Sequence, residues 1–309
     1  MLGLAQAPLA VAPATAYLMI GGRCLLDCAF CAQGRHSQAS ALNLSRVTWP
    51  EYDLGLVMTR LAEAARQSAF RRVCLQVTVT LDAMERSLAV LRHLKAVSSM
   101  PVDIAILPRT LEQVRRLMDA GADHIGFGLD AACERVFVQV KGGNWGRSLN
   151  LLEETARSFP QRAVVHLIVG LGETEQEIIE RIQWAHDRGI TVGLFAFTPL
   201  RGTSLADRSP PPLAVYRRIQ AARWLIVHGR AQAQQMAFDT AGRLIDYGAF
   251  LPLTGEPFQT SGCPDCNRPF YNELPGGPWY NYPRPLTAEE IVQARCEMGL
   301  DSGFYLSGG

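Results

Sequence analysis

Three cysteines near the start of the chain have a spacing that suits an iron-sulfur cluster. Cys24, Cys28 and Cys31 form Cys-x3-Cys-x2-Cys directly after the apolar residues 16–20. Three thiolates so close together can bind three irons of a [4Fe-4S] cube and leave the fourth iron open to an amino-carboxylate group from outside. Two other interpretations stay open, namely a zinc site with His36 as fourth ligand and three unrelated buried cysteines.

A second cysteine pair lies far along the chain. Cys263-Pro-Asp-Cys266 is a tight knuckle that lets two thiolates converge on one metal. Cys74 alternates with Gln76 and Thr78, so its thiol points inward if that face lines a barrel. We predict a second [4Fe-4S] cluster with Cys74, Cys263 and Cys266 as ligands. A structural zinc knuckle shared with another chain and a redox dithiol are the alternatives.

The composition and net charge of the chain limit the kinds of partner and compartment that we expect. The chain has 309 residues, is 48% hydrophobic and carries a net charge of +1, so nothing indicates a nucleic-acid or polyanion partner. No apolar run is long enough to span a membrane, and the first residues lack the basic start and apolar core of a secretory signal. We expect a cytoplasmic protein whose eight cysteines are metal ligands or buried thiols.

Six repeats of strand, loop and amphipathic helix predict an α/β fold with a partial (β/α)6 barrel over residues 1–229. The predicted strands are 16–20, 71–79, 102–107, 123–128, 162–169 and 190–198.

The remaining residues, 230–309, have a different character. Residues 252–285 contain eight prolines, which end the helical period, but they also contain many aromatic residues, which disordered tails lack. We therefore predict an ordered, irregular cap over the open end of the barrel, followed by a helix near 287–298.

The first cysteine loop, with the aromatic Phe30 before its last cysteine, resembles the cluster loop of the radical S-adenosylmethionine (SAM) superfamily. Members bind SAM at the open iron, reduce it by one electron and release a 5′-deoxyadenosyl radical that removes hydrogen from unreactive carbon. The resemblance implies a [4Fe-4S] cluster on Cys24, Cys28 and Cys31, with SAM beside it and Phe30 in contact with the cofactor.

In parallel α/β barrels the residues after each strand carry the site. Asp130, after the fourth strand, could accept hydrogen bonds from the SAM ribose, or it could be a helix N-cap. Arg147 could pair with the methionine carboxylate, or it could be a solvated arginine at a helix start. His166, inside a strand, is interpreted as a core histidine.

Two later segments complete the predicted SAM site. Gly170, Gly172 and Glu173 lie in a segment that resembles the superfamily's fifth-strand glycine motif, which packs against the adenine. Thr198 ends a sixth apolar strand whose backbone could pair with the adenine edge, although any buried strand has the same pattern.

Residues 123–132, 167–174 and 197–204 together resemble the biotin-synthase-like branch of the superfamily. Biotin synthase binds a [2Fe-2S] cluster with cysteines on strands two, three and five and an arginine on a late strand. Cys74 matches the strand-two position, but residues 102–107 and 163–167 contain no cysteine, which makes biotin synthesis doubtful. The cap motifs at 258–273 and 280–287 are similar to the two-protein lipoyl synthases of archaea and some sulfur-oxidising bacteria, and the likeness spans about residues 15–295.

This last resemblance implies sulfur insertion. The deoxyadenosyl radical would remove hydrogen from C6 or C8 of an octanoyl chain on a carrier-protein lysine, and a sulfide of the sacrificial second cluster, held by Cys263 and Cys266, would attack the carbon radical. The implied partners are a second lipoyl synthase subunit, the octanoylated carrier protein, and a reductant such as ferredoxin or flavodoxin.

Two other functions compete with this one. The first is another radical SAM reaction in which the cap cysteines are only structural. The second is a scaffold protein without enzymatic activity that holds zinc or a cluster. The fourth ligand of the second cluster also stays open at this point, with Ser261 and Ser307 as candidates.

Overall fold

Six parallel strands form the centre of the molecule, and their order in the sheet is their order in the chain. The computed structural model describes residues 2, 11–251, 254–269, 271–273 and 277–300. The sheet order is β1-β4-β5-β6-β7-β8, which confirms the six predicted strands and the partial barrel. The strands are β1 (Thr15–Ile20), β4 (Arg72–Val77), β5 (Val102–Ala105), β6 (His124–Asp130), β7 (Ala163–Val169) and β8 (Thr191–Ala196).

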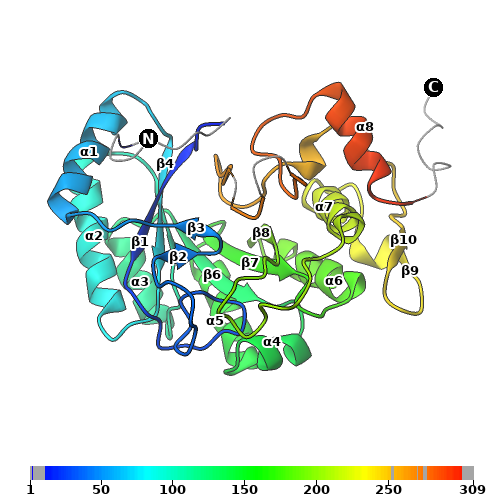
Figure 1. Ribbon diagram of the computed structural model, residues 1–309, viewed down its shortest axis with the longest axis horizontal. Coiled ribbons are helices and arrows are strands. Elements are labelled where there is room, and N and C mark those ends of the chain that lie inside the picture. The colour runs from blue at the N-terminus through cyan, green and yellow to red at the C-terminus, as the bar shows by residue number, and fades with distance from the viewer. Residues whose placement is uncertain (1, 3–10, 252–253, 270, 274–276, 301–309) are drawn as a thin grey trace.

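Helices connect the strands and cover the outside of the sheet (Figure 1). Several begin at a side chain that accepts a backbone N–H, for example Thr110 before α3 and Thr174, which forms a capping box, before α6. Each helix turns an apolar face to the sheet, as the buried Leu88, Leu91 and Leu94 of α2 illustrate. The helices are α1 (Leu54–Arg66), α2 (Ala83–Val97), α3 (Leu111–Asp119), α4 (Glu134–Val140), α5 (Trp145–Ser158), α6 (Glu175–His186) and α7 (Leu213–Val227).

Alternate residues of the strands face the inside of the barrel. The register aligns Tyr17 with Cys74, Cys74 with Asp103, and Asp103 with His124, so these four side chains form one row across β1, β4, β5 and β6. Residues two positions further along, such as Gln76, form a second row closer to the carboxyl ends of the strands. Polar residues and a cysteine therefore lie inside the barrel, while Leu75 and its neighbours in register pack against the helices.

The barrel is open between β1 and β8, and a segment from the C-terminal part of the chain fills this gap. Ser261 Oγ accepts the backbone N–H of Leu194 on β8 at 2.9 Å, and Asn267 Oδ1 accepts the backbone N–H of Ala14 next to β1 at 2.9 Å. We name residues 258–273 the closing segment, of which residue 270 is not described. Part of the predicted cap therefore closes the side of the barrel, since both edge strands have backbone groups that need partners.

The rest of the C-terminal part consists of small elements packed beside α6 and α7 (Figure 1). A helix, α8, begins after the N-cap Thr287, as predicted, and the division into two domains at residue 229 stays a prediction. Among the described residues, no helix has the length and apolar character needed to cross a membrane. These elements are β9 (Ala237–Phe238), β10 (Leu244–Asp246) and α8 (Ala288–Cys296), with short 3-10 turns at Ala233–Gln235 and Glu256–Phe258, and a hairpin of β2 (Asn43–Leu44) and β3 (Val47–Thr48) lies beside the barrel.

Arg217 on α7 holds the C-terminal part in place. Its side chain is fully buried, and it donates to the Tyr280 carbonyl at 2.8 Å and to Glu297 at 2.9 Å. Removing one partner of a buried ion pair leaves an uncompensated charge and lost hydrogen bonds.

We predict that Arg217→Met lowers the free energy of unfolding by about 3–5 kcal/mol. Chemical denaturation followed by circular dichroism measures the change. Arg60→Met is the matched control, because the Arg60–Glu63 pair is exposed and such pairs contribute less than about 1 kcal/mol. Equal losses in the two variants would show that Arg217 does not hold the C-terminal part.

Candidate functional site

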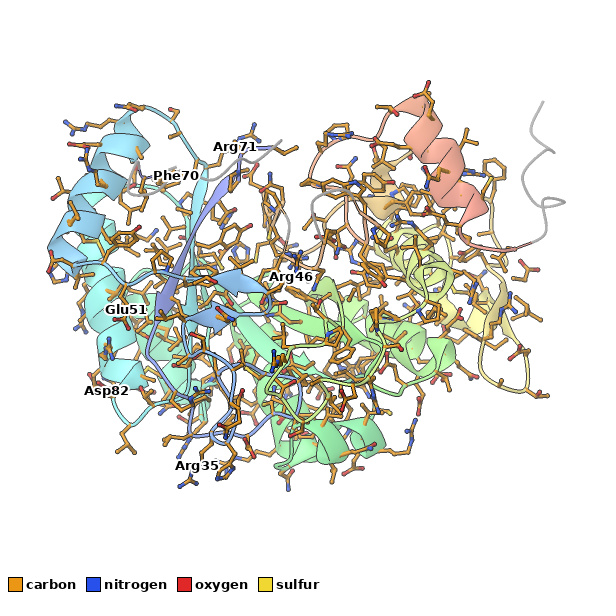
Figure 2. The ribbon with its side chains drawn as sticks, in the orientation of Figure 1. Arg35, Arg46, Glu51, Phe70, Arg71 and Asp82 are labelled. Atoms are coloured by element: carbon orange, nitrogen blue, oxygen red, sulfur yellow. The ribbon has the colours of Figure 1, made fainter. Side chains whose placement is uncertain are left out.

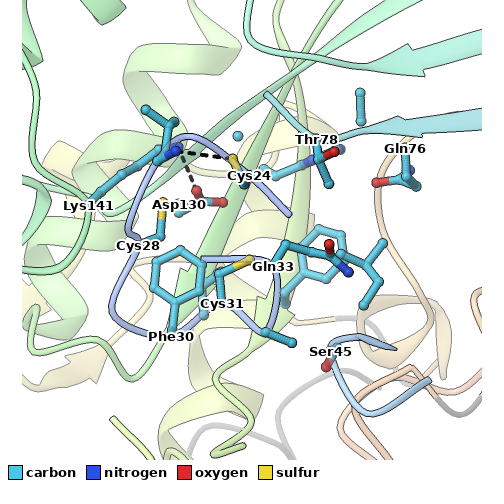
Figure 3. Close-up of a pocket in the computed structure, with 18 of the residues that line it drawn as sticks. Cys24, Cys28, Phe30, Cys31, Gln33, Ser45, Gln76, Thr78, Asp130 and Lys141 are labelled. Atoms are coloured by element: carbon cyan, nitrogen blue, oxygen red, sulfur yellow. Dashed lines mark hydrogen bonds and ion pairs between the residues drawn. The ribbon is translucent and has the colours of Figure 1, made fainter. Parts of the chain in front are cut away.

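A cavity of about 250 Å³ opens at the carboxyl ends of the strands, and the first three cysteines line it (Figure 3). Predicted site residues Phe30, Asp130 and Thr198 also line it. Most of its remaining wall is apolar, with the residues Met19, Leu26, Leu44, Val77, Val79, Ala105, Ile106, Leu107, Ile168, Phe195, Ala196, Phe197 and Leu200.

The cysteine loop is held in shape by its own backbone. Cys24 N–H donates to the Gln33 carbonyl at 2.8 Å, and Cys31 N–H donates to the Cys28 carbonyl at 3.0 Å. Gly21 allows the loop to leave β1, because its φ is 110° and a β-carbon there would lie 2.0 Å from Thr78 Oγ1. The strand end and the loop therefore bring the three thiols to one wall of the cavity.

Burial controls the charge of these thiols. It raises the pKa of Cys28 to about 12 and of Cys31 to about 11, so both are protonated at neutral pH when no metal is bound. As the side chains stand, no three His, Cys, Asp or Glu residues of the described ranges could hold a metal ion. The fit to a cluster rests on the donor set of three cysteines on one wall, of which Cys28 and Cys31 would lose their protons when iron binds.

The zinc alternative receives no support from His36. Its Nδ1 lies 2.9 Å from Asp27 Oδ2, and its side chain is 76% exposed. His36 is also absent from the residues that line the cavity. The histidine is hydrogen-bonded to Asp27 at the surface beside the loop.

A buried cation that the sequence analysis did not identify lies beside the cysteines. Lys141 Nζ is 2.7 Å from Asp130 Oδ2, and Figure 3 shows both side chains facing the cavity. Burial lowers the pKa of Lys141, but Asp130 and Cys28 outweigh this effect and raise it, so the ammonium stays charged. Lys141 is therefore a charged group on the cavity wall, and no spacing rule in the sequence distinguishes it.

The structure does not bring Arg147 to this cavity. The residue lies in the first turn of α5, where its Nη2 donates to the Arg109 carbonyl at 3.3 Å beside a separate surface hollow. Gly142 and Gly143, with φ of 72° and 90°, turn the chain after α4, so residue 141 points inward and residue 147 outward. The predicted pairing of Arg147 with a carboxylate in the cavity is not supported, and the helix-start interpretation describes its position.

The predicted glycine motif after β7 forms a turn beside the cavity. Glu173 accepts the backbone N–H of Gly170 at 2.6 Å and that of Leu171 at 3.1 Å. Its carboxylate therefore stabilises the turn that contains Gly170 and Gly172, and these motif residues are not among those lining the cavity. The structure assigns this motif a shaping role at the edge of the site.

His166 lines the cavity, although the sequence analysis treated it as a core residue. Its ring lies edge-on to Phe195, with 5.2 Å between the ring centroids. Burial lowers its pKa to about 4, so the imidazole is neutral at pH 7. A neutral histidine in an apolar wall adds a polar atom to the cavity without adding charge.

Cys74, Cys263 and Cys266 come together at the inward-facing row formed by Tyr17, Cys74, Asp103 and His124, which we call the lower row because it is farther from the carboxyl ends of the strands. Gln76 Nε2 donates to Cys74 Sγ at 3.0 Å, and the Tyr17 hydroxyl lies 3.4 Å from Cys266 Sγ. Burial raises the pKa of Cys263, as do the nearby Cys74 and Cys266 in smaller measure. The structure thus brings the three predicted ligands of the second site together.

Charged residues surround this second cysteine set. Burial lowers the pKa of the enclosed Arg268, but Cys266 and Tyr17 raise it by more, and the Arg268 backbone N–H donates to Tyr17 at 3.1 Å. Asp265 pairs with Arg71 at 2.8 Å. Figure 2 shows Arg71 and Arg35, a residue of the first cysteine loop, at opposite ends of the molecule. On β4, Cys74 comes two residues before Gln76, which lines the cavity, whereas the first cysteine set follows the carboxyl end of β1. The two cysteine sets therefore lie at different heights in one barrel.

Comparisons with known proteins agree with this architecture. Residues 18–185 match the family model of the Radical SAM superfamily. The chain is 27% identical to a biotin synthase from Nitratidesulfovibrio vulgaris, over 76% of this chain and 69% of that protein, and 26% identical to one from Thermus thermophilus, over 84% and 75%. These similarities confirm the resemblance to the biotin-synthase-like branch.

Among solved structures, the FeFe-hydrogenase maturase HydG from Carboxydothermus hydrogenoformans superposes with a TM-score of 0.55 at 17% identity. The match covers 70% of this chain and 51% of HydG, so the chain spans about half the length of that protein. At this identity the likeness supports the fold alone, and it confirms the partial barrel.

The raised thiol pKa values predict slow alkylation of the metal-free protein. At pH 8, Cys28, with a pKa of about 12, has a thiolate fraction roughly a thousandfold below that of an ordinary cysteine. Iodoacetamide should therefore label the exposed Cys296 first, as measured by peptide mass spectrometry over time. Labelling of Cys28 as fast as Cys296 would contradict the burial described above.

Proposed function

Because this chain belongs to the radical SAM superfamily, we propose that it is a lipoyl synthase subunit that inserts sulfur into an octanoyl chain on a carrier-protein lysine. The observation that carries the proposal is the second cysteine set, Cys74, Cys263 and Cys266, inside the same barrel as the first. When bound, the first cluster and SAM supply hydrogen-atom abstraction from unactivated carbon.

The cavity beside the first cysteine set suits an alkyl substrate. Much of its wall consists of Val, Ile, Leu and Phe side chains, and Tyr271 and Asn272 of the closing segment also line it. Asn272 is fixed in place, because its Nδ2 donates to the Ala196 carbonyl at 2.8 Å and to Thr198 at 3.1 Å. Such walls exclude water, which a carbon radical requires, and bury an eight-carbon chain favourably.

The positions of the two cysteine sets, one above the other along the strands, support sulfur transfer. Cys74 lies one inward-facing position below Gln76, which lines the cavity, and this step along a strand is about 7 Å. A substrate carbon in the cavity would then lie between the site of hydrogen abstraction and a cluster held by the lower cysteines. The catalytic role that we give Cys263 and Cys266 is to hold that cluster as the sulfur donor.

The absence of further cysteines on the strands favours lipoyl over biotin synthesis. The sequences of β5 and β7, VDIA and AVVHLIV, contain none. The named relatives are biotin synthases, so another reaction of that branch is the second candidate. In our proposal the partners are a second subunit, the octanoylated carrier protein and a one-electron donor such as ferredoxin or flavodoxin.

The decisive experiment uses an octanoyl-lysyl peptide. The anaerobically reconstituted protein, reductant, SAM and the candidate second subunit are incubated with it, and the peptide is examined by mass spectrometry. We expect addition of sulfur together with 5′-deoxyadenosine. Abundant deoxyadenosine with unchanged peptide would remove the lipoyl assignment and favour the second candidate.

The same assay on a variant with Cys263→Ala and Cys266→Ala separates the two cysteine sets. SAM cleavage should persist, because the first set is intact, while sulfur addition should fall to background. Cys133→Ala is the control, since Cys133 lies at the start of α4 and away from both sets. If the double variant still adds sulfur, the donor role given to the closing segment is wrong.

We propose that Lys141 holds the carboxylate of SAM. A charge-assisted hydrogen bond contributes about 1.5–3 kcal/mol, so Lys141→Met should weaken SAM binding roughly tenfold to a hundredfold. Arg147→Met should bind SAM as the parent protein does. Anaerobic equilibrium dialysis of cluster-loaded protein measures both, and iron content shows that each variant is loaded. Weakened binding in Arg147→Met with unchanged binding in Lys141→Met would reverse the assignment.

A further inference from the structure

Asp103 lies on the lower row of the barrel, directly beside Cys74. The two residues are paired in the register of β4 and β5, and adjacent strands are about 4.8 Å apart, so their side chains are neighbours on the inner face. Asp103 is only 3% exposed. A carboxylate this deeply buried requires compensating partners.

Among the described residues, only Oδ1 of the two carboxylate oxygens accepts hydrogen bonds from nitrogen atoms. Oδ1 accepts hydrogen bonds from Arg72 Nη1 at 2.7 Å and from His124 Nδ1 at 2.8 Å. Within the described part of the chain, no nitrogen or oxygen atom donates a hydrogen bond to the buried Oδ2, and the side chain beside the carboxylate is the Cys263 thiol. A buried carboxylate oxygen held only against a thiol is poorly compensated, and this arrangement of two potential ligands points to a metal site.

Asp103 lies beside two cysteines of the second set. Its carboxylate interacts with the Cys263 thiol and with Cys74, its neighbour in the strand register. Arg72 connects Asp103 with the closing segment. Its Nη1 donates to Asp103 Oδ1, and its Nε donates to the Pro264 carbonyl at 3.1 Å. The carboxylate and the cysteine knuckle are thus fixed by one side chain.

We propose that Asp103 is the fourth ligand of the second [4Fe-4S] cluster and binds one iron through Oδ2. This inference rests on the proposed function, which supplies the second cluster. Cys74, Cys263 and Cys266 bind the other three irons. Ser261, one of the two serines considered from the sequence, is engaged, since its Oγ accepts the Leu194 N–H, and Ser307 lies outside the described residues.

The chemistry of the ligand fits the proposed use of the cluster. A carboxylate is a harder ligand than a thiolate and binds iron in a sulfide cluster less tightly. The iron held by Asp103 is then the corner that detaches most readily when a sulfide is removed. Arg72 and His124 on Oδ1 orient the carboxylate, as outer hydrogen bonds orient metal ligands generally.

The test isolates the second cluster. In the full-length chain, Cys24, Cys28 and Cys31 are changed to Ala, and the protein is reconstituted anaerobically with iron and sulfide. We expect about four irons per chain in this parent, and about three in the same protein with Asp103→Ala, with the electron paramagnetic resonance signal of a [3Fe-4S] cluster. Asp103→Cys should restore about four, because a thiolate replaces the carboxylate.

The controls separate ligation from structural support. Asp123→Asn removes a carboxylate that pairs with Lys95 outside the barrel, and it should leave the iron content unchanged. If the alanine variant fails to fold, Asp103→Asn takes its place, because asparagine has nearly the shape of aspartate. Mössbauer spectra of this variant then show whether the ligation of the iron has changed.

The outcomes distinguish this inference from the proposed function. Full iron content and an unchanged spectrum in both the alanine and asparagine variants would overturn the role of Asp103 and leave the second cluster intact. A parent protein that takes up no iron would overturn the second cluster itself, and the Asp103 ligand with it.

Discussion

The closing of an incomplete barrel is the constraint on which this molecule depends. A six-stranded parallel sheet leaves β1 and β8 without partners on one side, and the exposed backbone groups must be satisfied. The closing segment does this with side chains, Ser261 on β8 and Asn267 beside β1. Because Cys263 and Cys266 lie between these two anchors, the segment that completes the barrel also carries two thiols to its interior.

The position of the closing segment depends in turn on buried arginines. Arg217 binds the carbonyls of Trp279 and Tyr280, and Arg218 pairs with Glu175 at the start of α6. Buried pairs of this kind contribute little net stability compared with apolar packing, but they require one arrangement of their partners. We interpret them as the contacts that fix where the irregular C-terminal part lies relative to the barrel, since regular secondary structure is scarce there.

Features that repeat or follow a fixed spacing could be predicted from the sequence. The periodicity of apolar residues predicted the six strands, the capping residue Thr287 predicted the last helix, and the spacing of the cysteines predicted both cysteine sets. Lys141 could not be found in this way, because its direction depends on the glycine turn after α4. The same turn explains why Arg147 points away from the cavity. Asp103 was equally hidden, since a carboxylate inside a barrel is recognised only once the strand register is known.

Charge balance connects the two cysteine sets to folding. Burial raises the pKa of Cys28 and Cys31 in the first set and of Cys74 and Cys263 in the second. Each set also has a cation close by, Lys141 at the first and Arg268 at the second. Binding of metal would release protons from these thiols and leave thiolates that attract the two cations. At the second set this attraction acts between Arg268 and cysteines on the closing segment and on β4. Loading of the second site and closure of the barrel would therefore stabilise each other, because the same contacts serve both.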